Sequence, residues 1–116
     1  MAPLRREDFL LRQLKAVAAM LARIVGLRVS GRADEARVEL ENAYTELLGS
    51  RGELIRRVDE ATAARLLGSR EAVVALADLL TQEALLEEDH DRRARLEERA
   101  SRVRGALPNE DRDAGV

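Results

Sequence analysis

The sequence contains no cysteine and no tryptophan, and its only other aromatic residues are Phe9 and Tyr44. The absence of cysteine excludes disulfides, thiolate catalysis and cysteine-based zinc sites. No apolar run reaches the roughly 18 residues that a membrane span needs, because basic side chains interrupt the most apolar segment. The first residues, MAPLRREDF, contain acids where a signal peptide would have its apolar core. We therefore expect a cytoplasmic protein with no membrane partner.

The composition favours amphipathic helices. Alanine, leucine, glutamate and arginine, all good helix formers, dominate the 116 residues. Hydrophobic residues reach 46% while charged residues reach 36%, a combination that a disordered chain does not show. The length fits one domain, which we place at residues 1–107, with 108–116 expected to form a disordered C-terminal tail.

Charge is unevenly distributed along the chain, although the net charge is only −2. Residues 1–33 hold seven basic and two acidic side chains, and residues 92–104 hold six and two. Acids exceed bases in the segments between. This pattern predicts ion pairs between neighbouring helices. A basic surface for nucleic acid or another anion is the alternative, but basic and acidic residues are interspersed and aromatics for base stacking are almost absent. We therefore expect no nucleic-acid partner.

Apolar periodicity predicts an antiparallel helical hairpin in the first half of the chain. Between residues 4 and 29, large apolar residues recur at steps of four and three, from Leu10 to Ile24. Ser30 and Gly31 interrupt this pattern, and a second amphipathic helix is expected at 33–48. Two apolar faces joined by a short connection pack against each other.

Three further helices are expected in the second half of the chain, at 53–67, 70–88 and 91–107. Ser50 and Glu53 have capping-box spacing at the start of the first, and Asp59 with Thr62 is an alternative break within it. Gly68 followed by a serine predicts a stop and a new start. The sequence thus indicates an all-α antiparallel bundle of four to five helices, with 70–88 central and 91–107 peripheral.

The expected helix at 4–29 has a second apolar stripe, formed by Leu11, Ala18, Val25 and Val29. A helix with two apolar stripes is normally covered on two sides. We take these four residues as the candidate interaction surface. The expected helix at 70–88, a protein partner or a second copy of the chain would cover them, and a homodimer is the hypothesis that follows.

The turn of the hairpin resembles a tetratricopeptide repeat. Gly31, Ala36, Leu40 and Ala43 have the spacing of a turn glycine followed by alternating small and large residues, and Leu27 precedes them. The resemblance implies helical hairpins and a protein- or peptide-binding groove between them. A helical hairpin that merely obeys the same packing rules would show the same pattern.

A second, weaker copy of the pattern lies near the C-terminus. Asp89, Ala94 and Ser101 follow Leu85 at similar spacing, but Glu98 stands where the repeat has a large apolar residue. The copies are 58 residues apart, against about 34 in a regular array. The REDFLLRQL opening and the ELLG and RLLG helix ends also resemble small uncharacterised bacterial helical proteins.

Acidic residues are the main candidates for catalytic chemistry. Glu35 and Glu39 share a helix face, as do Glu83 and Glu87, and such pairs on facing helices build metal sites in helical hydrolases. His90, the only histidine, lies within the acidic run 87–91, which we interpret as a solvated loop with Asp91 capping the last helix. A single histidine cannot supply a diiron site, which needs two.

These observations favour a non-catalytic protein-interaction or scaffolding module that needs no cofactor and no metal. A carboxylate-based metal or nucleotide hydrolase using Glu35, Glu39, Glu83 and Glu87 is the alternative. An arginine-based nucleic-acid or anion binder is the third.

Overall fold

The computed structural model describes residues 6–107, and all its regular structure is helical. The predicted all-α class is therefore confirmed. The elements are α1 (Arg6–Val29), α2 (Ala33–Leu48), the 3-10 turn η1 (Gly49–Arg51), α3 (Gly52–Arg57), α4 (Glu60–Leu67), α5 (Arg70–Leu86) and α6 (His90–Gly105). The proposed tail at 108–116 lies outside the described residues.

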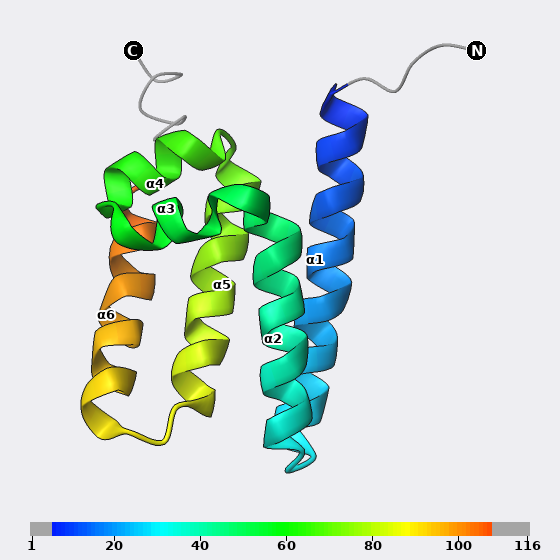
Figure 1. Ribbon diagram of the computed structural model, residues 1–116, viewed down its shortest axis with the longest axis vertical. Helices are drawn as coiled ribbons and strands as arrows, with labels where there is room; N and C mark the ends of the chain where they lie inside the picture. The colour runs from blue at the N-terminus through cyan, green and yellow to red at the C-terminus, as the bar shows by residue number, and fades with distance from the viewer. Residues whose placement is uncertain (1–5, 108–116) are drawn as a thin grey trace, which may run out of the picture.

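Two long hairpins lie side by side, and a short helical pair crosses one end (Figure 1). Helices α1 and α2 form the first hairpin, and α5 and α6 form the second. Helix α5 contacts α1, α2, α4 and α6, which confirms its predicted central position. Helix α6 packs mainly on α5 and is peripheral, as expected. Among the helices of residues 6–107, none is long and apolar enough to cross a membrane.

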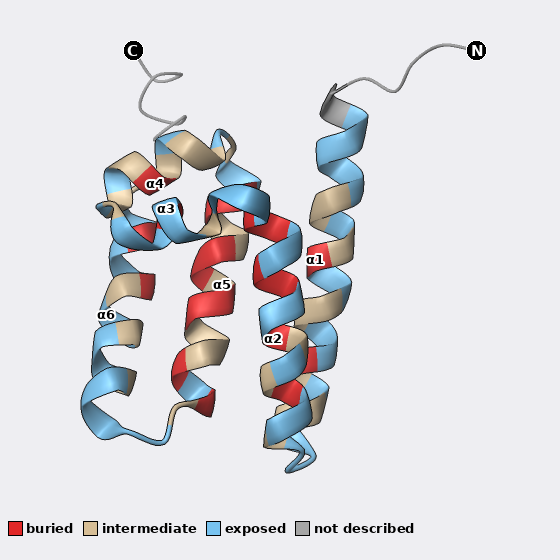
Figure 2. Cartoon of the chain, in the orientation of Figure 1, coloured by how far each residue is buried: buried red, intermediate tan, exposed pale blue. Residues whose placement is uncertain are grey.

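One hydrophobic core joins the two hairpins (Figure 2). Its largest fully buried side chains come from four helices: Val17, Ile24, Ile55, Val73, Leu79 and Val103. Red, buried segments run along the facing sides of α2 and α5, whereas α1 is buried on one side only. The first apolar stripe of α1 supplies that side, because Val17 and Ile24 lie in the core.

Local signals place most helix boundaries where the sequence predicts them. Gly31 and Gly68 take positive φ angles of 77° and 79° after α1 and α4, a conformation that favours glycine. The Ser69 hydroxyl caps α5 by accepting a hydrogen bond from the Ala72 N–H at 3.1 Å. Asp59 caps α4 by accepting from the Thr62 N–H. The break at Asp59 is therefore real, and the expected helix at 53–67 is two helices.

Two predicted caps are wrong. Ser50 does not start a helix with Glu53, because the chain leaves α2 through η1 and enters α3 after Arg51, which makes no side-chain cap. Asp91 does not cap the last helix. Asp89 does so instead, accepting from the Arg92 N–H at 2.9 Å, because α6 already begins at His90. Asp91 lies in the first turn, where its charge still favours the helix dipole.

Candidate functional site

The second apolar stripe of α1 is left uncovered by the rest of the described chain. Leu11 is 53% exposed and Val29 is 73% exposed, Ala18 is also exposed, and only Val25 is half-buried. Helices α2 and α5 both contact α1, but the side of α1 that is buried is its other stripe, where Val17 and Ile24 lie.

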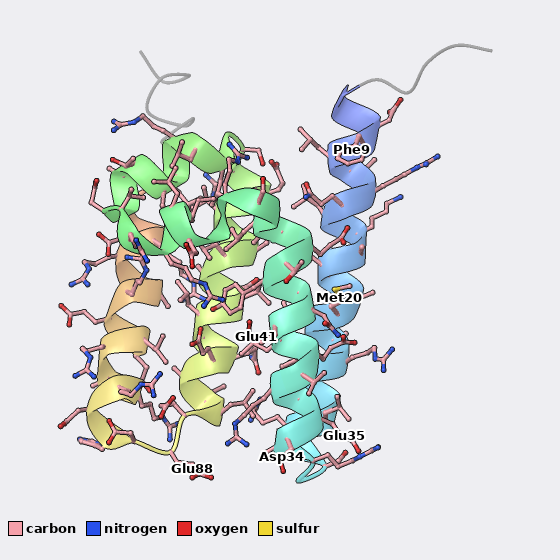
Figure 3. All side chains as sticks on the ribbon, viewed as in Figure 1. Phe9, Met20, Asp34, Glu35, Glu41 and Glu88 are labelled. Atoms are coloured by element: carbon pink, nitrogen blue, oxygen red, sulfur yellow. The ribbon has the colours of Figure 1, made fainter. Side chains whose placement is uncertain are left out.

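The exposed stripe continues through residues that share its helical face. Lys15 and Ala22 fill the gaps, so the steps along the chain are four, three, four, three and four. We call this face the outer strip of α1: Leu11, Lys15, Ala18, Ala22, Val25 and Val29. Phe9, 61% exposed, lies near the start of α1 (Figure 3), but about 160° around the helix from Leu11 and so outside the outer strip. An apolar face of this length on one helix is unusual for a surface that only meets water.

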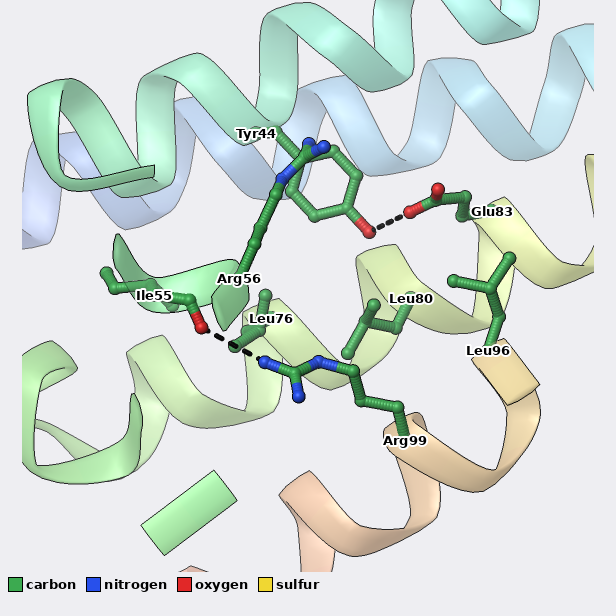
Figure 4. Close-up of a pocket in the computed structure, with 8 residues that line it drawn as sticks. All are labelled: Tyr44, Ile55, Arg56, Leu76, Leu80, Glu83, Leu96 and Arg99. Atoms are coloured by element: carbon green, nitrogen blue, oxygen red, sulfur yellow. Dashed lines mark hydrogen bonds between the residues drawn. The ribbon is translucent and has the colours of Figure 1, made fainter. Parts of the chain in front are cut away.

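A separate pocket lies between α2, α3, α5 and α6 (Figure 4). Its volume is about 170 Å³. Four apolar side chains and four polar ones line it: Ile55, Leu76, Leu80 and Leu96, with Tyr44, Arg56, Glu83 and Arg99. Two of the four apolar residues, Leu76 and Leu80, come from the buried face of α5.

A phenol, a carboxylate and a guanidinium form a chain at one wall of this pocket. The Tyr44 hydroxyl donates a hydrogen bond of 2.6 Å to Oε1 of Glu83. The guanidinium of Arg56 lies 4.4 Å from the centre of the Tyr44 ring, a cation–π contact. The same guanidinium lies 4.0 Å from Glu41. Tyr44 is only 4% exposed and belongs to the hydrophobic core.

Arg99 forms part of the opposite wall of the pocket. Its Nη2 donates to the carbonyl of Ile55 at 3.0 Å, and its Nη1 reaches Glu60 at 3.3 Å. Ile55 lies in the last turn of α3, so an arginine from α6 supplies partners for the open carbonyls at that end. The pKa of Glu60 lies below its ordinary value. The first cause is a hydrogen bond from its own backbone N–H to the carboxylate, and the positive charges of Arg102 and Arg99 lower the pKa further.

Burial and the neighbouring Glu83 raise the pKa of the Tyr44 phenol above its ordinary value of 10.0. The folded state therefore favours the neutral phenol. The resulting stability is complete below pH 10 and is lost as the pH rises toward the native pKa. Tyr44 is the only tyrosine, so the tyrosinate absorbance reports on it alone. We expect this absorbance to appear in one step together with loss of helical circular dichroism.

Tyr44→Phe is the control, and it should shift the alkaline unfolding transition to higher pH. A tyrosinate signal that grows near the ordinary pKa while the helix content is intact would show that solvent reaches the phenol.

The four carboxylates of the hydrolase alternative do not meet. Glu39 pairs with Arg23 of α1 at 3.0 Å, and Glu35 lines the same hollow between α1 and α2. Glu83 and Glu87 line a different hollow on the α5 side of α2. No group of three or more potential acidic or histidine metal ligands comes together within residues 6–107.

The acidic run 87–91 is occupied by local contacts. A carboxylate oxygen of Glu87 accepts a hydrogen bond from the Asp89 N–H at 3.2 Å, and Asp89 caps α6. Glu88 lies 3.7 Å from Arg37 of α2. His90 is exposed at the first position of α6.

Many arginines pair with acids on neighbouring helices, as the charge pattern predicts. Arg23 joins α1 to α2, Arg104 joins α6 to Asp78 of α5, and Arg102 joins α6 to Glu60 of α4. Acids neutralise the arginines of these pairs, whereas an extended phosphate-binding surface would need arginines that are not neutralised.

Sequence reasoning missed the pocket. The reason is that no spacing rule connects residues from four helices. No protein-family model matches the chain, and neither a curated protein nor a solved structure matches it significantly.

Proposed function

We propose that this protein is a non-catalytic interaction module that self-associates in the cytoplasm through the outer strip of α1. The observation that carries the proposal is the exposed apolar face itself, with Leu11 and Val29 at its ends. Burying such a face against a second copy removes apolar surface from water, and two-fold pairing is the commonest form of self-association.

The strip suits antiparallel pairing of two α1 helices. With the two-fold axis at the middle of the strip, Ala18 faces the partner's Ala22, and Leu11 faces the partner's Val29. The small central side chains let the helix backbones approach closely, while the larger ends fill the space beside them. The 24 residues of α1 give a contact of up to about 36 Å along the axis.

Charge does not oppose this pairing. Lys15 is the only charged residue in the outer strip, and it faces the partner's Val25. The two Lys15 side chains attach about 15 Å apart along the axis, beyond the Debye length of roughly 8 Å at physiological salt.

The tetratricopeptide resemblance supports a protein-binding role. In the first hairpin, Ala36, Leu40 and Ala43 are buried against neighbouring helices, and Gly31 makes the turn. The second copy of the pattern gives less support, because Ala94, Glu98 and Ser101 are exposed. The proposal rests on the first hairpin alone.

Ala18→Glu tests the proposal. Ala18 is exposed in one copy, so the change should leave the fold intact, whereas in the pair it places two carboxylates near the axis. We expect the wild-type chain to be a dimer at micromolar concentration and the variant a monomer, measured by size-exclusion chromatography with light scattering.

Ala19→Glu is the matched control. Ala19 is also exposed on α1 but lies about 100° around the helix from Ala18, outside the strip. This variant should remain dimeric. A monomeric wild-type chain, or equal loss of the dimer in both variants, would contradict the proposal.

A further inference from the structure

Three charged residues line the pocket between α2, α3, α5 and α6, and they differ in whether they have an oppositely charged partner. Arg99 is held by Glu60 and by the Ile55 carbonyl, and Arg56 lies over the Tyr44 ring near Glu41. Each guanidinium therefore has an acid. Glu83 has only the neutral Tyr44 hydroxyl, and among residues 8–107, whose side chains the structure describes, no cation lies at ion-pair distance from its carboxylate.

The apolar part of the pocket offers room for a short carbon chain. Leu76 and Leu80 form its floor, and Leu96 of α6 forms a side. A cavity of about 150 Å³ with such a lining holds a benzene molecule in another protein. The volume here is about 170 Å³. An apolar cavity that ends beside a half-buried carboxylate complements an aliphatic ammonium ion, whose carbon chain is apolar and whose end is positively charged.

We propose that this pocket binds a primary alkylammonium group, with Glu83 as the ion-pair partner and the leucines around the carbon chain. The group is either a free aliphatic amine or the side chain of a lysine in a protein. Tyr44 positions the Glu83 carboxylate through its hydroxyl and leaves the second carboxylate oxygen for the ligand. The inference goes beyond self-association and does not depend on it.

Three probes of equal chain length test the proposal: hexylammonium, hexanol and hexanoate. Binding is followed by Tyr44 fluorescence, which comes from the pocket alone because the chain has no tryptophan and no other tyrosine. Amide shifts at Leu80 and Leu96 in two-dimensional NMR locate the site. We expect hexylammonium to bind tightest. A blocked lysine, Nα-acetyl-lysine N-methylamide, then distinguishes a lysine side chain from a free amine as the ligand. Its backbone must remain outside the pocket, so it binds only if the pocket accepts a side chain.

Glu83→Gln keeps the shape and the acceptor for Tyr44 but removes the charge. It should weaken hexylammonium binding by roughly tenfold or more and leave hexanol binding unchanged. Glu71→Gln, an exposed acid on the same helix, is the matched control and should bind like the wild type. Preference for hexanoate, equal binding of all three probes, or no binding at millimolar concentration would each overturn the proposal.

Discussion

Leu79→Ala is expected to lower the free energy of unfolding by about 3–5 kcal/mol. Leu79 is fully buried in α5, the helix that contacts α1, α2, α4 and α6. Alanine is the better helix former, so the change leaves α5 itself intact and removes only packing. A domain of this size has about 5–15 kcal/mol of stability in total, so the variant should lose a large part of it. Urea unfolding followed by circular dichroism measures the difference.

Leu85→Ala is the control for this experiment. It is the same change on the same helix, but Leu85 is 38% exposed. We expect a loss below about 1 kcal/mol, since little apolar area returns to water. Equal losses at the two positions would contradict the placement of Leu79 in the core and of Leu85 at the surface.

The helix boundaries could be predicted because their causes are local. A glycine with positive φ, such as Gly31 or Gly68, and a capping serine, such as Ser69, act within one turn of the chain. The two wrong caps have a local cause as well. Ser50 has the right spacing for a cap, but α2 continues directly into a 3-10 turn, and periodicity carries no signal for that.

The surroundings of each helix face could not be predicted. Two apolar stripes were recognised on the first helix, but only the packing of α2 and α5 against α1 decides that Val17 is buried while Leu11 is open. The carboxylate alternative fails for the same reason. Glu39 and Glu83 belong to pairs with correct spacing on their own helices, yet they point to opposite sides of α2.

The pocket depends on contacts that are even less local. Tyr44 and Glu83 are 39 residues apart, and Arg99 and Ile55 are 44 apart. An arginine-rich chain offers many possible partners for each carbonyl and carboxylate, so composition alone cannot choose among them. The choice is made by how α6 lies against the end of α3.

The contact between Arg99 of α6 and the end of α3 predicts the second large effect on the free energy of unfolding. Helix α3 has six residues, too few to be stable alone in water, and Arg99 satisfies carbonyls at its end. Arg99→Met keeps most of the apolar stem but removes the guanidinium from the Ile55 and Val58 carbonyls and from Glu60. Because hydrogen bonds to a charged group contribute about 1.5–3 kcal/mol, we expect a loss of that size in the free energy of unfolding.

Hydrogen exchange distinguishes this role from a general loss of packing. In Arg99→Met the amides of α3 should exchange faster than those of α2, because the end of α3 has lost its cap while the first hairpin is unchanged. Arg95→Met, one turn earlier on α6 at an exposed position, should leave both stability and exchange as in the wild type. Full rescue by Arg99→Lys would contradict the argument, since a single ammonium cannot bond two carbonyls and a carboxylate with the geometry of a planar guanidinium.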